Sequence, residues 1–314
     1  MFRSFYLILC ILLIPTLSHA SANEAAVAPE VIFIKLGGSI VTNKMDPYSV
    51  RLPAIAQFAK ELAEVMKARP HMKFIIGHGS GSFGHTAAIE QRFDKKTGFP
   101  TIQAAAIVSK AALDLHAMII AELVKANIPA FSMPPSATGM MDYNSKRLVS
   151  MDILQIQRIL EIGGVPVVFG DVVPFSNGDG TYIAYTEEIF AFLTKHFHPS
   201  SIFLLGEVLK DKMEGMYNSY SSQFGNKNSQ GISEITPETW GQILSTVTGA
   251  KRNDETGILL TKVKIMMDLV KRNPEIKVYV ASGLVENVLK DLLVNNIQQP
   301  TCMLIHATDK KKSP

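Results

Sequence analysis

The chain has little cysteine and little charge, and both shortages narrow what it can be. Its 314 residues include 2 cysteines, and because Cys10 lies in the N-terminal segment described next, a chain without that segment keeps Cys302 alone and forms no internal disulfide. Charged residues make up 19% and hydrophobic residues 47%, which indicates a globular protein with a sizeable core. The net charge is +3 and the basic residues are scattered, apart from a short basic tail over residues 309–314, so no stripe favours nucleic acid.

Long hydrophobic runs are also missing, except near the N-terminus. Arg3 precedes an apolar run over residues 5–17, and a small-residue end follows at Ala20. The run is shorter than the about 20 residues that span a membrane, so residues 1–20 predict a signal peptide, followed by a spacer over 21–30. A cleaved signal peptide predicts an exported protein, which would be periplasmic or secreted. An uncleaved segment would instead act as a membrane anchor.

From residue 31 onward, compact apolar runs alternate with segments of helical periodicity. Strands are predicted at 31–34, 74–76, 130–133, 165–171, 202–205, 277–281 and 302–306. Helices are predicted at 52–68, 104–126, 151–161, 187–196, 261–271 and 285–293. The alternation predicts an α/β fold, a three-layer αβα sandwich around a mainly parallel open sheet. The polar stretch over 218–231 has no apolar periodicity and predicts a loop or hairpin.

Two glycine-rich stretches follow the first two predicted strands. Lys35 is followed by Gly37 and Gly38, and the segment HGSGSFGH occupies residues 78–85. Glycine lets the backbone approach a ligand closely, and successive N–H groups at a strand-to-helix turn bind anions. Because ligands lie at the carboxyl ends of parallel strands, both stretches are expected to face one crevice, and a phosphate is the expected ligand. The Walker pattern of nucleotide-binding loops does not occur in this sequence.

Each of these features has an alternative interpretation from the residues alone. Lys35 can reach water above an ordinary tight turn. His85 can donate to a phosphate oxygen or serve a structural purpose, and the neighbouring glycines favour the first interpretation. His78, at the junction of strand and loop, is interpreted as structural.

Four motifs, in order, resemble those of the amino acid kinase superfamily. They are the stretches KLGGSIVTNK at 35–44, GHGSGSFGH at 77–85, GDVV at 170–173 and DETGILLTK at 254–262. Within the superfamily, the Gly-Ser-Phe-Gly-His run is similar to that of isopentenyl phosphate kinases, with fosfomycin kinases as near relatives. The resemblance extends over residues 31–305.

The resemblance implies an acceptor lobe over 31–180, a nucleotide lobe over 181–308, and a kinase that uses ATP and Mg²⁺ to convert a small phosphate monoester into a diphosphate. The implied catalytic residues are Lys35, Lys44 and His85. The implied acceptor-binding residues are Gly79, Ser80, Gly81, Ser82, Gly84, Gly170 and Asp171. The implied nucleotide-binding residues are Gly37, Gly38, Ser39, Gly206, Gly257 and Lys262. No residue is predicted to bind metal directly.

The nucleotide half departs further from the family pattern than the acceptor half. Where the family often has an Ile-Ser-Gly-Asp-Asp stretch that organises the lysines, this chain has AYTEE, in which Glu187 offers a carboxylate with a longer reach. The stretch over 206–217 is longer and altered. Isopentenyl phosphate kinase activity is therefore the first hypothesis, a fosfomycin-type kinase of phosphonates or other small anions the second, and an exported, non-catalytic binding protein the third. The expected partners are ATP and a small phosphorylated substrate, with a homodimer as the oligomer considered and no stable membrane association after cleavage.

Overall fold

The computed structural model describes residues 29–43, 45–207, 234–240, 254–297 and 303–307, with the backbone alone described over 254–262. The predicted signal peptide, Cys302, the polar stretch at 218–231 and the basic tail lie outside the described residues. Predictions about them stay predictions.

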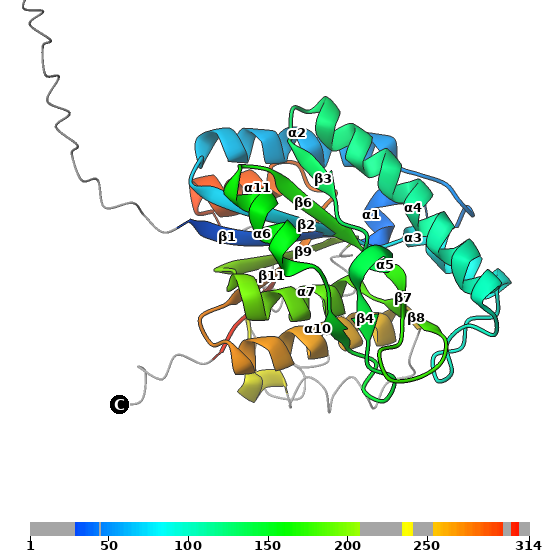
Figure 1. Ribbon diagram of the computed structural model, residues 1–314. Coiled ribbons are helices and arrows are strands. Elements are labelled where there is room, and N and C mark those ends of the chain that lie inside the picture. The colour runs from blue at the N-terminus through cyan, green and yellow to red at the C-terminus, as the bar shows by residue number, and fades with distance from the viewer. Residues whose placement is uncertain (1–28, 44, 208–233, 241–253, 298–302, 308–314) are drawn as a thin grey trace, which may run out of the picture.

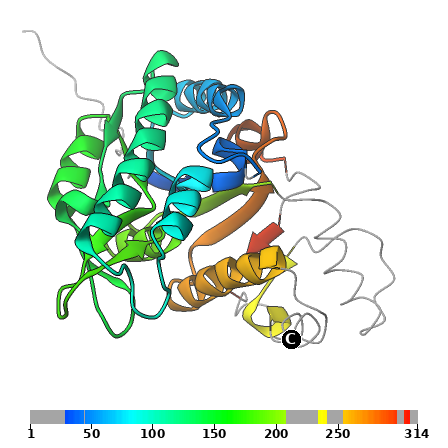
Figure 2. The ribbon, with the colours of Figure 1, turned by 90° about the vertical axis from the view of Figure 1, so that its right-hand side faces the viewer.

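A single eight-stranded sheet runs through the molecule, with the strand order β10-β12-β11-β9-β1-β2-β6-β3 (Figures 1 and 2). From β9 to β3 through β1, β2 and β6, neighbouring strands are parallel, and so are β9 and β11, whereas β12 runs antiparallel to β11. This confirms the predicted mainly parallel sheet. The strands are β1 (Glu30–Leu36), β2 (Met72–His78), β3 (Ala130–Ser132), β6 (Val165–Phe169), β9 (Ser201–Gly206), β10 (Glu234–Ile235), β11 (Lys277–Ser282) and β12 (Met303–Ile305).

Helices cover both faces of the sheet, with α2, α4 and α11 on one face and α7 and α10 on the other (Figure 1). The longer helices are α2 (Leu52–Ala68), α3 (Gly81–Glu90), α4 (Ile102–Lys125), α6 (Ile153–Glu161), α7 (Thr186–Phe197) and α10 (Asp254–Arg272). Short elements are α1 (Gly38–Val41), α5 (Pro135–Thr138), α11 (Val288–Lys290) and the π-helix η1 (Asp291–Asn295). Two small antiparallel sheets pair β4 (Met140–Met141) with β5 (Leu148–Ser150) and β7 (Asp171–Pro174) with β8 (Thr181–Ala184).

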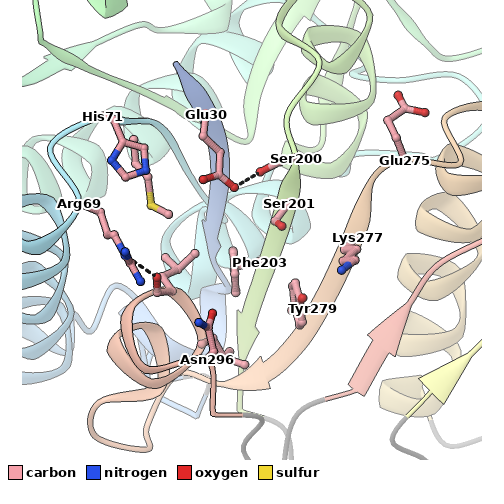
Figure 3. A pocket seen from close by; sticks show the side chains of 13 residues that line it. Glu30, Arg69, His71, Ser200, Ser201, Phe203, Glu275, Lys277, Tyr279 and Asn296 are labelled. Atoms are coloured by element: carbon pink, nitrogen blue, oxygen red, sulfur yellow. Dashed lines mark hydrogen bonds between the residues drawn. The ribbon is translucent and has the colours of Figure 1, made fainter. Parts of the chain in front are cut away.

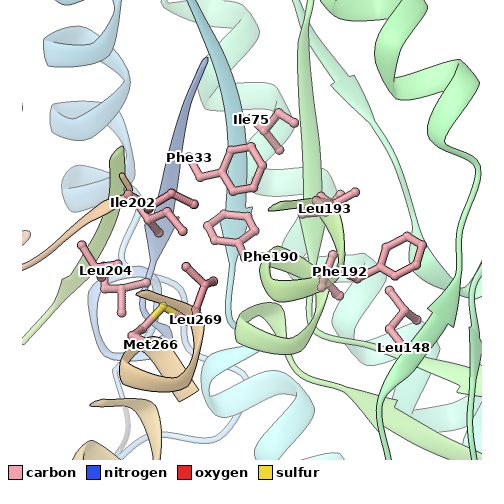
Figure 4. Close-up of a cluster of buried hydrophobic side chains, with 14 of the residues drawn as sticks. Phe33, Ile75, Leu148, Phe190, Phe192, Leu193, Ile202, Leu204, Met266 and Leu269 are labelled. Carbon is pink, nitrogen blue, oxygen red and sulfur yellow. The ribbon is translucent and has the colours of Figure 1, made fainter. Parts of the chain in front are cut away.

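Because side chains alternate along a strand, β1 contributes to two cores. Phe33 points toward α7, where its ring lies 5.0 Å from that of Phe190 among the apolar side chains of Figure 4. Ile32, Ile34 and Leu36 point to the other face, toward α2 and α4. A strand buried on both faces has apolar side chains on both, which is why β1 reads as a continuous apolar run.

The helix α4 is, within the described chain, long and apolar enough to cross a membrane by length and composition. Its buried residues, among them Val108, Leu115 and Ile119, pack against neighbouring elements, and it contacts α2 and α3. Its composition is therefore also that of a core helix.

The structure differs from several of the predicted elements. The segment predicted as a glycine loop over 78–85 already enters helix α3 at Gly81, although its glycine and serine residues are poor helix formers. The strand predicted over 165–171 ends at Phe169, and after Gly170 the chain enters the β7–β8 hairpin at Asp171. The helix predicted over 285–293 is the short α11 continued by η1.

The lobe boundary predicted at residue 180 falls between β7 and β8, which pair with each other. In addition, β1 from the first predicted lobe pairs with β9 from the second. One sheet therefore joins the two halves, and their assignment to acceptor and nucleotide stays a prediction.

A buried carboxylate ties α2 to α11. Glu61 is 5% exposed and accepts hydrogen bonds from the backbone N–H groups of Leu289 and Lys290, the latter at 3.0 Å. Burial raises the pKa of Glu61, and the backbone donors oppose that shift. The side chain thus satisfies N–H groups that have no partner within their own helix.

We expect Glu61→Ala to lower the free energy of unfolding by about 1–3 kcal/mol, because it leaves buried N–H groups without an acceptor. Glu61→Gln keeps a carbonyl oxygen there and should cost less. Glu64→Ala, which removes an exposed ion pair with Lys290, is the control and should change stability by no more than about 1 kcal/mol. Urea unfolding measures all three, and equal losses for Gln and Ala at position 61 would contradict this account.

Candidate functional site

The strand order changes direction at β1, because later strands are added first on one side of β1 and then on the other. From β1 it continues to β2 and later to β6, whereas β9 and β11 lie on the other side of β1. In open α/β sheets, the crevice outside the carboxyl ends of the strands at such a point is where ligands bind. The register aligns Leu36 with His78 and Leu205, so the loops that follow these three strands begin at one level.

Lys35 is buried near the end of β1 and forms an ion pair with Glu187 of α7. Its side chain lies on the same face of the sheet as that of Phe33, which is the face that α7 covers. Gly77 stands beside Lys35 in the sheet, and a Cβ there would lie 2.6 Å from Cγ2 of Thr186. The missing side chain lets the start of α7 approach the sheet and bring the Glu187 carboxylate to the lysine.

The glycines of the first two loops contact each other through their backbones. A Cβ at Gly38 would lie 2.7 Å from Cα of Gly81, and one at Gly79 would lie 3.0 Å from N of Gly38. Gly81 has φ +50°, and a Cβ there would lie 2.2 Å from Oγ1 of Thr42. A side chain at these positions would therefore push the loops apart, so the glycines are required by packing as well as by any ligand.

Backbone N–H groups with no acceptor within the described part of the chain include those of Gly38, Ser39, Ser80 and Gly81 in these loops. The Gly37 and Gly79 N–H groups differ, because they donate to Leu205 and Leu36. The four N–H groups lie at the starts of α1 and α3, where helix backbones leave donors unpaired. Together with the nearby lysine, they form an arrangement suited to phosphate oxygens.

Two predicted acceptor residues have structural partners. The Ser82 N–H donates to Oγ1 of Thr42 at 2.9 Å, and the Ser82 hydroxyl accepts from the Ser49 N–H at 3.3 Å. The Asp171 carboxylate is buried and accepts from the Ser109 hydroxyl at 2.8 Å and from the Ser136 N–H at 3.0 Å. Both residues tie neighbouring elements together near the carboxyl ends of the strands, and direct contact with a ligand stays a prediction for them.

The remaining residues of the acceptor loop surround the start of α3. Ser80 precedes the first residue of α3, and its hydroxyl fills the space beside Gly84, where a Cβ would lie 2.2 Å from it. His85 lies one turn further along α3, and its side chain is exposed. Gly170, at the end of β6, donates its N–H to the carbonyl of His78.

On the opposite side of β1, the loop after β9 meets two neighbours. The Glu207 N–H donates to the Ser39 hydroxyl at 3.2 Å, and the Gly206 carbonyl accepts from the Gly283 N–H at 3.0 Å. Ser282 ends β11 and Gly283 follows it; neither had been predicted as a site residue, although they repeat the pattern of glycine directly after an apolar strand. They complete the row of strand ends at the crevice.

Three predicted residues are only partly described, or not at all. Lys44 lies outside the described residues. Gly257 and Lys262 lie within the helical backbone of α10, and their surroundings are outside what the structure describes. Their predicted roles in nucleotide binding are untested.

A pair of buried histidines lies behind the acceptor loop. His78 Nε2 lies 2.8 Å from Nδ1 of His116, whose Nε2 lies 2.7 Å from the hydroxyl of Ser132. Burial lowers the pKa of His78 to about 3, with His116 and Lys35 adding to the shift, and burial lowers the pKa of His116 to about 4. Both rings are therefore neutral at physiological pH, and the prediction of a structural His78 agrees with this burial.

No group of three or more histidine, cysteine, aspartate or glutamate side chains in the described part of the chain is placed to hold a metal ion. A magnesium ion commonly binds through substrate phosphates and water. The described residues thus offer no protein cage for Mg²⁺.

A pocket of about 490 Å³ opens at the opposite end of the strands (Figure 3). Glu30, Ser201 and Lys277, which begin β1, β9 and β11, help to line it. It is separate from the glycine loops, which follow the carboxyl ends of the same sheet.

The sheet order, the buried lysine and the converging backbone donors define an α/β protein with a candidate anion site at the carboxyl ends of its strands. The sequence profile of the amino acid kinase family matches residues 30–282, and the chain belongs to that family. The family comprises kinases, which are phosphotransferases that use ATP.

Curated relatives of the chain are isopentenyl phosphate kinases. That of Methanothermobacter thermautotrophicus is 35% identical over 156 residues, which are 46% of this chain and 54% of the relative, so the match spans about half of that protein. That of Methanocaldococcus jannaschii is 26% identical over 253 residues, or 76% of this chain and 86% of the relative.

Solved structures confirm the fold. An isopentenyl phosphate kinase structure superposes with a TM-score of 0.66 at 20% identity and covers 87% of this chain and 100% of its own. Carbamate kinase from Giardia lamblia bound to AMP-PNP superposes with a TM-score of 0.59 at 12% identity, covering 90% of this chain and 99% of its own. At these identities the likeness establishes the amino acid kinase fold.

The buried histidines predict a loss of stability in mild acid. In the unfolded chain each would titrate near 6.5, whereas the folded protein binds these protons only near pH 3 and 4. The unfolded state therefore binds more protons below pH 6.5, so the stability present above that pH should fall as the pH falls. Between about pH 5 and 7, the free energy of unfolding, measured with urea at each pH, should change less steeply with pH for His116→Asn than for the native chain. His71→Asn, which changes an exposed histidine, should leave the slope unchanged, and an unaltered slope in His116→Asn would contradict the assignment.

Proposed function

We propose that this protein is a kinase that transfers the terminal phosphoryl group of ATP to a small phosphate monoester, with isopentenyl phosphate as the first acceptor to test. The observation that carries the proposal is the Lys35–Glu187 pair next to two glycine loops in which several N–H groups have no acceptor within the described chain. The names of the relatives supply the acceptor class. One relative has also been solved as an isopentenyl phosphate kinase substrate complex, with a TM-score of 0.61 to this chain.

ATP supplies the phosphoryl group. An oxygen of the acceptor phosphate forms a bond to the terminal phosphorus, the bond from that phosphorus to the bridging oxygen breaks, and ADP leaves with the bridging oxygen. No protein nucleophile is required, because phosphoryl transfer depends mainly on positioning and on neutralising charge.

The residues of the chain have distinct tasks in this proposal. Lys35 neutralises charge between donor and acceptor phosphates, and Glu187 holds the lysine in place until phosphate oxygens compete for it. The N–H groups of Gly38 and Ser39 face the nucleotide phosphates, and those of Ser80 and Gly81 face the acceptor phosphate. From the family resemblance, Lys44 and Lys262 add positive charge, and His85 binds the acceptor.

The surroundings of α3 next to the acceptor loop are apolar. Ala87 of α3 is buried against Ala105, Val108 and Ala111 of α4 and against Val172 of β7. These side chains fill a core, so the proposal of an acceptor with an apolar part rests on the names of the relatives. A phosphonate acceptor of the fosfomycin type would require only a small polar site.

The predicted export of the protein rests on residues outside the described part of the chain and stays a proposal. It matters for function because an exported kinase needs a source of ATP outside the cytoplasm. A non-catalytic binding protein that keeps the acceptor loop would need none.

The first experiment mixes the protein with Mg-ATP and either isopentenyl phosphate or fosfomycin and follows the products by ³¹P NMR. We expect a new diphosphate pair together with ADP in the isopentenyl phosphate sample. Product from fosfomycin alone would replace the acceptor class, and intact ATP in both samples from folded protein would favour the binding protein.

In the same assay Lys35→Ala should lose most transfer activity, because no other charge replaces the ammonium between the phosphates. Lys110→Ala, which removes an exposed lysine of α4, is the control and should keep the native rate. Native turnover in Lys35→Ala would exclude Lys35 from the reacting phosphates.

We also expect His85→Ala to raise the KM for the acceptor by about ten-fold or more, as for loss of a hydrogen bond to a charged group, and to change the KM for ATP far less. His71→Ala removes an exposed histidine at the other end of the sheet and is the matched control. An equal rise in both KM values for His85→Ala would assign the histidine a structural role.

A further inference from the structure

A chain of hydrogen bonds leads from the acceptor loop to the surface through two buried rings. His78 Nδ1 lies 3.1 Å from the carbonyl oxygen of Gly79, and the chain continues through His116 to Ser132 of β3, an exposed residue. His78 is 0% exposed and His116 3%, and both rings stack with Phe169. Each of the four ring nitrogens thus has a partner in an otherwise apolar setting.

The groups at the ends of this series of hydrogen bonds determine which atom donates and which accepts in each of them. The carbonyl oxygen of Gly79 only accepts, so His78 must carry its proton on Nδ1. A neutral His78 then accepts at Nε2, which requires a proton on Nδ1 of His116. His116 in turn accepts at Nε2, and the Ser132 hydroxyl donates to it.

The hydrogen bond from His78 to the Gly79 carbonyl restrains the part of the acceptor loop whose backbone is otherwise the most flexible. Gly79 and Gly81 flank Ser80, and glycine leaves a backbone free to rotate. The Gly79 carbonyl and the Ser80 N–H belong to one planar peptide group and point in opposite directions. Holding the carbonyl from one side therefore aims the Ser80 N–H at the other.

The backbone of His78 connects the same point to other parts of the site. Its carbonyl oxygen accepts from the Thr186 hydroxyl at 2.7 Å and from the Gly170 N–H at 3.1 Å. Thr186 directly precedes Glu187, the partner of Lys35. His78 thus joins the acceptor loop, the end of β6 and the start of α7.

We propose that His78, His116 and Ser132 act as a positioning chain that holds the Gly79–Ser80 peptide so that the Ser80 N–H is directed at the acceptor phosphate. The inference rests on the proposed function for the identity of that phosphate. Two buried polar rings are a costly way to fill a core, since an apolar pair of similar volume needs no partners. The direction that the two rings impose on the loop explains their presence in the core.

Two substitutions at position 78 separate the two sides of the ring. Asparagine offers an amide N–H near the position of Nδ1 and keeps the bond to Gly79, whereas glutamine reaches the position of Nε2 and loses it. We expect His78→Gln to weaken binding of isopentenyl phosphate by about ten-fold, measured by calorimetry without ATP, and to leave ATP affinity within about three-fold. His78→Asn should recover most of the loss. Equal effects of the two variants on isopentenyl phosphate, or a parallel loss of ATP affinity, would overturn the proposal.

A second measurement needs neither ligand nor turnover. In ¹⁵N NMR spectra of the native chain, both His78 and His116 should carry their proton on Nδ1, with assignments from the His78→Asn and His116→Asn variants. Ser132→Ala should shift the Nε2 signal of His116 in particular. A proton on Nε2 of either ring would overturn the positioning chain, even in an active kinase.

The two measurements distinguish this inference from the proposed function. A native chain that shows the Nδ1 pattern but binds no isopentenyl phosphate overturns the proposed acceptor, and inorganic phosphate then replaces it as the probe for the two position-78 variants. Phosphate affinity that is equal in the native chain and in His78→Gln would overturn the positioning chain as well.

Discussion

The position of β1 between β2 and β9 determines most of what surrounds it. Its register brings Leu36 level with His78 and Leu205, so loops distant in sequence start from neighbouring points. Its alternation sends Ile34 and Leu36 to one core and Lys35 toward α7 on the other face. A shift of one residue would exchange the faces and bury the lysine among the leucines and isoleucines beneath α2. The register of β1 therefore determines both the packing of the core and the position of the Lys35 ammonium group.

Charge at the site is balanced within the protein. Lys35 and Glu187 are both buried, and a buried charge without a partner is strongly unfavourable. The pair lets the folded protein keep an ammonium group at the end of a buried strand. In the proposed function, phosphate oxygens would meet a lysine already in position, and the backbone donors of the two loops would add attraction without adding a titratable group.

Much of this arrangement could be predicted from the sequence, because it depends on patterns of residues that are close together in the chain. Continuous apolar runs identified β1, β2 and β6 because strands covered on both faces need apolar side chains throughout. Glycine after the strands predicted loops that come together, and the family resemblance suggested Glu187 as the carboxylate that organises the lysines. The start of α3 at Gly81 was missed because it depends on Thr42, which accepts from the Ser82 N–H across the loop contact. The partners of Asp171 and the link from His78 to His116 were missed for the same reason, since both join residues far apart in sequence.

The backbone contact between Gly38 and Gly81 has a consequence for how such sequences are compared. These glycines are needed for the two loops to close against each other, whether or not a phosphoryl group is ever transferred. A descendant that had lost its chemistry but kept its fold would still be expected to conserve them. The glycine motif thus indicates the fold. A lysine at position 35 opposite a carboxylate at position 187 is the better indicator that a related protein still catalyses a reaction.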